Sequence, residues 1–376
     1  MNIDHRIKTP LVTYSAVILI MACIVFVLQP ILAIYSGATP PHTDFLDWWK
    51  ISQAIVNGQA LPNVVFNYPP TFALFNLPFG WLDYPSAYLI FIFASISGYA
   101  LVIGKICKST LGLIFLTIST PAIYVILFGQ NGLLTASIAG VALLSLEKRR
   151  EIFAGILIAI LSIKPQLGLL FPIVLIAMGA WRAFITTTVV SICFFFGGML
   201  VLGVDAYFDW INKVILLSNS VQKIWLHVFS IYSFMLSIGA PVKLAYTTQL
   251  IVSLLITFSV WRVWRHCESW SIRCAVLATA TCMTSPYILL CDLTWLGLAL
   301  AWCTPLIFKQ DWSWGELMIC AFILLLPTLN ALQTVLGSPI NFQIGPFVIG
   351  LFYLVLLRRS QVFKYPLSID RPRQFN

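Results

Sequence analysis

Apolar residues follow one another in long runs along this chain, and only short polar or charged stretches interrupt them. A helix needs about 20 apolar residues to cross a bilayer. The charge-poor runs divide into about twelve such segments, within a range of 10 to 13, and the pattern therefore predicts an all-α polytopic membrane protein. Some runs are shorter than a full crossing, so we expect those helices to be bent, broken or half-inserted. The predicted spans are residues 12–34, 84–104, 110–128, 132–146, 152–164, 167–180, 183–203, 242–264, 273–290, 292–308, 315–334 and 341–357.

Composition agrees with this pattern and excludes several functions. Of the 376 residues, 60% are hydrophobic and 9% are charged, a balance that the core of a water-soluble protein could not bury. The net charge of +9 fits basic cytoplasmic loops better than a nucleic-acid partner, so no nucleic acid is expected. The nine cysteines are scattered through apolar runs without a C-x-x-C pair, which argues against a metal or redox site.

The basic residues predict the orientation, because Lys and Arg near span ends stay on the cytoplasmic side. The first span is too long for a cleaved signal and is taken as retained. We expect one membrane domain over residues 1–376, with both termini in the cytoplasm and a basic tail at 358–376. The basic positions that fall on the side of the N-terminus are Lys105, Lys108, the cluster "EKRRE" at 147–151, Arg182, Arg262, Arg265, Arg273, Lys309, Arg358 and Arg359.

Two longer segments are then predicted on the outer face, at 35–83 and 204–240. The first contains "HTDFLDWWK", which places Asp44 and Asp47 beside two tryptophans. Apolar residues recur at helical spacing from 45 to 55, which predicts an amphipathic helix lying on the membrane surface. Asp44 is then either the N-cap of that helix or a functional carboxylate.

Three polar motifs lie at predicted outer ends of spans. "FNYPP" places Tyr68 at interface depth, and "FGQNG" offers the amides of Gln130 and Asn131, although simple turns would explain both motifs. "SIKPQ", which ends in Gln166, places Lys164 on the outer side against the positive-inside trend. A lysine there suits the phosphate of a lipid carrier, and snorkelling to the surface is the alternative.

Two further positions carry chemistry in the second half of the chain. In "TSPYILLCDLTWL" a helix break is followed by Tyr287, and Asp292 begins the next span, where a buried carboxylate is costly and needs a reason. His227, in the second outer segment, is either a ligand for sugar or phosphate or an ordinary interfacial residue.

Taken in order, three stretches resemble the integral-membrane glycosyltransferases of family 87, which include polyprenyl-phosphate-mannose-dependent mannosyltransferases. They are "DFLDWWKISQAIVNGQALPNVVFNYPPTFALFNLPFGWL", "GQNGLLTASIAGVALL" and "RREIFAGILIAILSIKPQLGLLFP", and "SPYILLCDL" is a weaker match. The resemblance covers most of residues 30 to 185. It implies a GT-C fold, a lipid-phosphate sugar as donor, an active site facing outside, and a catalytic aspartate in the first outer loop, where Asp44 stands.

The resemblance also implies roles for the residues at these positions. Asp44 would be the general base of an inverting single displacement, and Asp47 is the second choice. Many GT-C enzymes carry two acidic residues adjacent or one apart, whereas these two are three apart, which leaves a metal role doubtful, so no obligatory metal is expected. The candidate substrate-binding residues are Asp47, Tyr68, Gln130, Asn131, Lys164, Gln166, Tyr287, Asp292 and His227.

The function expected from all this is transfer of a hexose, most plausibly mannose, from a polyprenyl-phosphate-sugar donor. The acceptor would be a glycolipid, glycan or protein on the outer face of the plasma (cytoplasmic) membrane, with membrane lipids as the surrounding partners. One alternative is a transporter or flippase of lipid-linked sugars that uses charges such as Asp292 and Lys164. Against it stands the single long first loop, which has no matching half. A non-catalytic membrane scaffold is the third possibility.

Overall fold

The computed structural model describes residues 43–62, 68–212, 228–336 and 343–362. Within these ranges the chain is helical apart from turns and one isolated antiparallel bridge between Val228 and Leu289. The first predicted span, 12–34, and His227 lie outside the described residues. The α-helices are α2 (Asp44–Val56), α3 (Pro70–Asn76), α4 (Tyr84–Cys107), α5 (Thr110–Thr117), α6 (Thr120–Phe128), α7 (Gly132–Glu147), α8 (Glu151–Ile160), α9 (Pro165–Gly168), α10 (Phe171–Met178), α11 (Trp181–Leu202), α13 (Ile231–Ser237), α14 (Val242–His266), α15 (Trp270–Thr284), α16 (Thr294–Ile307), α17 (Trp314–Leu336) and α18 (Gly345–Ser360). Short 3-10 helices are η1 (Leu77–Trp81), η2 (Leu161–Ile163) and η4 (Leu290–Leu293).

Several predicted spans are broken into shorter helices. The run at 110–128 forms two helices, α5 and α6, and the runs at 152–164 and 167–180 form α8, η2, α9 and α10. Prolines stand in the first turns of α6, α9 and α10, where a missing N–H is tolerated and a new helix can begin. Broken helices were expected for the short runs at 152–164 and 167–180, whereas the break in the longer run at 110–128 was not predicted.

The described residues contain four helical segments long and apolar enough to cross a membrane: Tyr84–Cys107, Trp181–Leu202, Val242–His266 and Leu290–Ile307. Helix α11 is the most exposed of them, and apolar side chains such as Leu200 face outward from it. An apolar exposed helix of this length is expected where the surroundings are lipid. The chain is therefore a polytopic membrane protein, while the count of about twelve spans stays a prediction.

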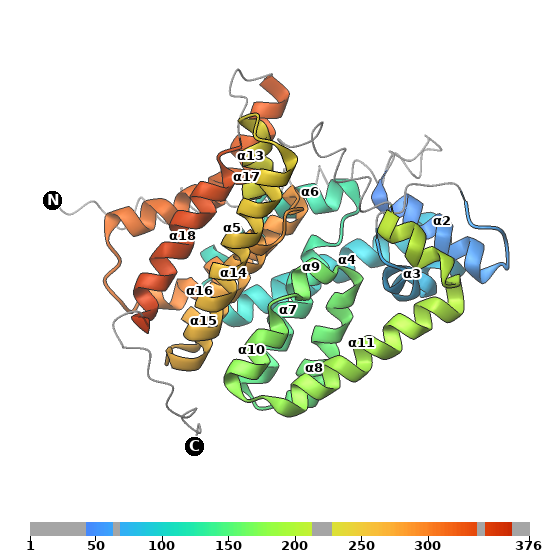
Figure 1. Cartoon of the computed structure of the whole chain (residues 1–376), viewed down its shortest axis with the longest axis horizontal. Coiled ribbons are helices and arrows are strands. Elements are labelled where there is room, and N and C mark those ends of the chain that lie inside the picture. The colour runs from blue at the N-terminus through green and yellow to red at the C-terminus, as the bar shows by residue number, and fades with distance from the viewer. Residues whose placement is uncertain (1–42, 63–67, 213–227, 337–342, 363–376) are drawn as a thin grey trace.

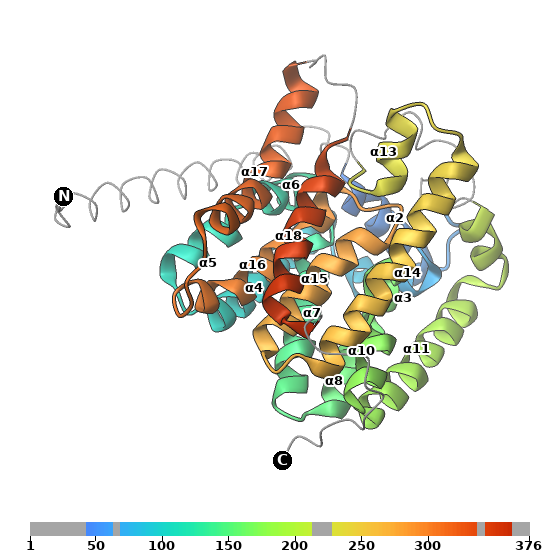
Figure 2. The same cartoon turned by 60° about the vertical axis from the view of Figure 1, so that its left-hand side comes forward.

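The helices pack into two groups, which meet where α14 packs against α10 and α16 packs against α7. Helices α14, α15, α16 and α18 lie on one side, and α7, α8, α10 and α11 lie on the other (Figures 1 and 2). Every residue of α15 from Ile272 to Thr284 is buried, so this helix forms the centre of the core. Helices α2 and α3 lie at one end, where α3 packs against α11.

Two of the basic positions near helix ends have acidic partners among the described residues. Arg359, near the end of α18, forms an ion pair of 2.6 Å with Glu316 and lies over the ring of Trp312. Arg182, near the start of α11, donates its backbone N–H to the Glu151 carboxylate at 3.2 Å. The predicted orientation depends on these two positions among others. The contacts describe their surroundings, and the orientation itself stays a prediction.

Candidate active site

Asp44 is the first residue of α2 and is not its N-cap. The cap is Thr43, whose hydroxyl accepts the Leu46 N–H at 3.2 Å and lies 2.9 Å from the hydroxyl of Tyr84. The alternative in which Asp44 merely caps the helix is therefore wrong. The residue is partly exposed.

Aromatic packing fixes α2 against its neighbours. Phe45 stacks on Phe91 of α4 with ring centroids 4.8 Å apart. Trp48 meets Tyr68 edge-on at 5.1 Å and Phe72 of α3 at 4.6 Å. Large buried rings of this kind hold a short helix rigidly. The ring contacts of Phe45 and Trp48 therefore fix the position of Asp44 at the start of the helix.

The "GQNG" turn is wedged between α2 and η4 by its two glycines. Gly129 has a φ of 63°, and an added Cβ there would lie 2.7 Å from the Cβ of Phe45. An added Cβ at Gly132 would lie 2.0 Å from the carbonyl oxygen of Cys291. Only glycine allows both close approaches, so the turn is positioned by backbone contact as well as by its own conformation.

Gln130 connects Asp44 to Tyr68. Its amide nitrogen donates a short hydrogen bond to the Asp44 carboxylate. Its amide oxygen accepts from the Tyr68 hydroxyl at 3.2 Å. Burial raises the pKa of the Tyr68 hydroxyl and the Lys164 cation opposes that shift, so the hydroxyl remains protonated at neutral pH and can donate.

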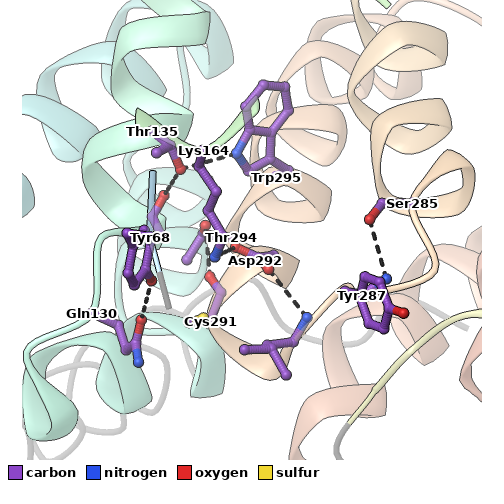
Figure 3. Close-up of polar contacts among 12 residues, drawn as sticks. Tyr68, Gln130, Thr135, Lys164, Ser285, Tyr287, Cys291, Asp292, Thr294 and Trp295 are labelled. Atoms are coloured by element: carbon purple, nitrogen blue, oxygen red, sulfur yellow. Dashed lines mark hydrogen bonds and ion pairs between the residues drawn. The ribbon is translucent and has the colours of Figure 1, made fainter. Parts of the chain in front are cut away.

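Lys164 and Asp292 form a buried ion pair beside Tyr68 (Figure 3). The Lys164 ammonium lies 2.6 Å from one carboxylate oxygen of Asp292, and the other oxygen accepts the Leu289 N–H at 3.1 Å. The side chains are 4% and 0% exposed. The ammonium also lies 5.8 Å from the centre of the Tyr68 ring, a cation–π distance. The buried Asp292 carboxylate therefore balances the charge of Lys164.

The remaining candidates divide between this site and other places. Asn131 adjoins Gln130 and is fully buried, and its amide has no hydrogen-bond partner among the described residues. Asp47 lies one turn along α2 from Asp44 and is buried. Gln166 is half-buried in α9.

Tyr287 lies apart from the site. Figure 3 shows it away from Lys164 and Asp292. Its hydroxyl pairs with that of Tyr246 in α14, and its ring lies 6.0 Å from that of Tyr232. In the sequence it lies in the helix break just before Asp292, but its side chain joins a cluster of tyrosines instead of the site. Its role in substrate binding stays a prediction, as does that of His227.

Further residues, which the sequence does not single out, support the site. The indole of Trp295 donates to the Thr135 hydroxyl at 3.2 Å, and Tyr99 donates to the Thr294 carbonyl at 3.0 Å, which ties α7 and α4 to α16. Thr71 of α3 donates to the Ser162 carbonyl at 2.9 Å, two residues before Lys164. These residues stand inside apolar runs, where a single threonine or tyrosine gives no distinct signal.

Replacing Gly132 with alanine tests the contact between the turn and η4. We expect a loss of about 1–3 kcal/mol in the free energy of unfolding, because the methyl group meets backbone that cannot rotate away. Gly315→Ala is the matched control, since an added Cβ there meets nothing within 4 Å. Thermal unfolding in detergent measures both variants, and equal stability would mean that the turn does not pack against Cys291.

Comparison with known proteins gives one family match. The model of glycosyltransferase family 87 matches residues 66–286. This range includes the "GQNG" turn and Lys164, but it begins after Asp44 and ends before Asp292. None of the curated proteins compared with the chain matches it.

Proposed function

The chain belongs to glycosyltransferase family 87, and we propose that this membrane glycosyltransferase moves a hexose, most plausibly mannose, from a polyprenyl-phosphate carrier to a hydroxyl-bearing acceptor. The acceptor would be a glycolipid, glycan or protein at the outer face of the plasma membrane. Asp44 is the proposed general base.

The observation that carries this proposal is the hydrogen-bond chain from Asp44 through Gln130 to Tyr68. It ends beside the Lys164–Asp292 pair. It gives one partly exposed carboxylate a fixed direction and places a cation within the same group of side chains. A sugar transfer that uses a lipid phosphate as leaving group needs both a base and a positive charge.

In the proposed reaction, Asp44 accepts the proton of the acceptor hydroxyl as its oxygen attacks the anomeric carbon of the sugar. The bond from that carbon to the phosphate oxygen breaks, and the electron pair leaves with the polyprenyl phosphate. One displacement inverts the anomeric configuration and needs no covalent intermediate. Gln130 orients the carboxylate by holding one of its oxygens.

Lys164 is the proposed electrostatic partner of the phosphate. One of its ammonium hydrogens goes to Asp292, and the others remain for a phosphate oxygen. Asp292 is then a positioning residue, because it holds the cation that would face the substrate. This differs from direct substrate binding by Asp292, the role expected from its place in the sequence.

A donor panel tests the proposed function. Purified full-length protein is given synthetic polyprenyl-phosphate mannose, polyprenyl-phosphate glucose or nucleotide mannose, together with a membrane-lipid acceptor extract. We expect label to enter the extract from a polyprenyl-phosphate donor, and mannose to be preferred over glucose. Transfer from the nucleotide sugar alone would overturn the lipid-carrier proposal.

Replacing Gln130 with leucine should lower the rate of transfer by about tenfold to a hundredfold, since a misdirected base attacks poorly. The free energy of unfolding should change little, because Asp44 is partly exposed and its carboxylate can turn to solvent when the Gln130 amide is lost. Gln59→Leu, at an exposed position beyond the end of α2, is the control. The two variants are compared by initial rate, and a native rate for Gln130→Leu would remove Gln130 from the mechanism.

Metal independence is a separate expectation that rests on the spacing of Asp44 and Asp47. We expect full activity after treatment with EDTA and removal of the chelator, and no stimulation by added Mg²⁺ or Mn²⁺. Activity that is lost with EDTA and restored by one of these ions would show the expectation to be wrong.

A further inference from the structure

A concave site lies near the end of α7 opposite to the "GQNG" turn. It is a pocket of about 610 Å³ between the starts of α8 and α11, and its charged lining is Arg149, Arg150, Glu151 and Arg182. Helix α7 has 16 residues, so its length of about 24 Å separates this pocket from Gln130. The proposed sugar transfer gives the pocket no role.

The protein holds the walls of this pocket by close packing. An added Cβ at Gly155 of α8 would lie 2.7 Å from the Ala183 carbonyl of α11, and Thr187 donates to the Gly155 carbonyl at 3.2 Å. Glu151 accepts the Arg182 N–H and joins the two helix starts. The pocket is thus part of a rigid helix pair.

The turn that supplies the arginines has an unusual backbone. Arg149 has a φ of 59°, in the left-handed region that residues other than glycine rarely adopt. This conformation brings the chain from α7 into α8 with Arg150 directly before the helix. Such strain costs free energy and is often kept where it positions functional side chains.

The pocket carries excess positive charge. Three arginines face one glutamate, and that glutamate already accepts a backbone N–H. Among the described residues, the guanidinium groups of Arg150 and Arg182 bind no carboxylate. Guanidinium groups bind phosphate oxygens in pairs of parallel hydrogen bonds, which makes a phosphate the best-matched anion.

The other half of the lining is apolar and exposed. Ile152 and Phe153 are 61% and 49% exposed, and Ile156 completes this wall. Helix α11, which supplies Arg182, also exposes Trp181 and Ile185. A soluble phosphate gains nothing from such a wall, whereas acyl chains below a phosphate headgroup would cover it.

We propose that this pocket binds an anionic phospholipid, with its phosphate on Arg149, Arg150 and Arg182 and its acyl chains along Ile152, Phe153 and Ile156. Basic pockets between membrane helices recognise lipid headgroups in this way. The lipid would hold the starts of α8 and α11 in the leaflet at the basic end of the molecule, and it would be separate from the sugar carrier.

Native mass spectrometry of the full-length protein tests the proposal with phosphatidylglycerol, phosphatidylcholine or inorganic phosphate as probe. We expect retained phosphatidylglycerol, and a drop of about a hundredfold in its affinity in the R149Q/R150Q/R182Q variant, since each basic residue near an anionic lipid contributes roughly a factor of five. The K105Q/K309Q/R358Q variant removes the same charge from exposed positions and should bind as the native protein does.

Three results would overturn the proposal: equal losses in the two triple variants, equal binding of phosphatidylcholine, or inorganic phosphate binding as tightly as the lipid. The R150Q/R182Q variant leaves the strained turn at Arg149 unchanged and serves if the triple variant unfolds. It should still lower phosphatidylglycerol binding by more than tenfold. Because no sugar donor is present, this experiment is independent of the proposed transfer reaction.

Discussion

Asp44→Asn is expected to lower sugar transfer by about 10²- to 10⁴-fold, the usual contribution of a positioned general base. Asparagine keeps the size of the side chain and an oxygen that Gln130 can still hydrogen-bond, so the fold should remain intact. Initial rates with a polyprenyl-phosphate sugar measure the effect, and thermal unfolding in the same detergent confirms that the variant is folded.

Asp83→Asn is the matched control for this variant. Asp83 lies in the same predicted outer segment and caps α4 by accepting the Ser86 N–H, and asparagine caps a helix about as well. Its activity should be native. If the folded Asp44→Asn variant transfers sugar at the native rate, Asp44 is not the base, and Asp47 becomes the next residue to replace.

The second large effect concerns the ion pair. Lys164→Met leaves Asp292 charged and unpaired at a position that is fully buried. Breaking a buried pair from one side costs about 3–5 kcal/mol, so we expect a strongly lowered unfolding temperature and little folded protein. Lys105→Met, at an exposed position, should change stability by no more than about 0.5 kcal/mol.

Replacing both partners separates stability from activity. The Lys164→Met/Asp292→Leu variant has no buried charge and should regain most of the lost stability, because apolar residues of similar size often replace a buried pair without cost. Transfer should remain low, since the cation for the phosphate is missing. A double variant with native activity would show that the pair serves only the fold.

The sequence predicted the location of the site better than its internal contacts. Asp44, Tyr68, Gln130 and Lys164 were all candidate site residues, and the structure brings these side chains together. Each stands at a polar break between apolar segments, and such breaks are visible in a single sequence.

The pairing of Lys164 with Asp292 could not be predicted in the same way. The two residues are 128 positions apart, and the sequence marked each as a separate charge in need of a reason. The pairing depends on tertiary packing, including that of η4 against the start of α7, where Gly132 has no side chain to meet the Cys291 carbonyl oxygen. Tyr287 shows the converse, because a hydroxyl partner in α14 directs it elsewhere.

The positions of the helix breaks were also beyond the hydrophobic pattern, although the shorter runs were expected to be bent or broken. The run at 110–128 contains no charged residue, and only Ser and Thr residues near 117–120 and the proline in the first turn of α6 mark the point where two short helices replace one span. Proline is tolerated in both arrangements in membranes, so its presence does not decide between them.

The most direct test of the proposed sugar transfer follows the sugar of synthetic polyprenyl-phosphate mannose in liposomes that contain the purified protein. Label is placed on the mannose, and an acceptor extract is supplied on one side of the bilayer. A glycosyltransferase should move label into the acceptor and leave free polyprenyl phosphate, and Asp44→Asn should abolish both. Label that crosses the bilayer while still attached to its lipid would contradict the account and establish a transporter.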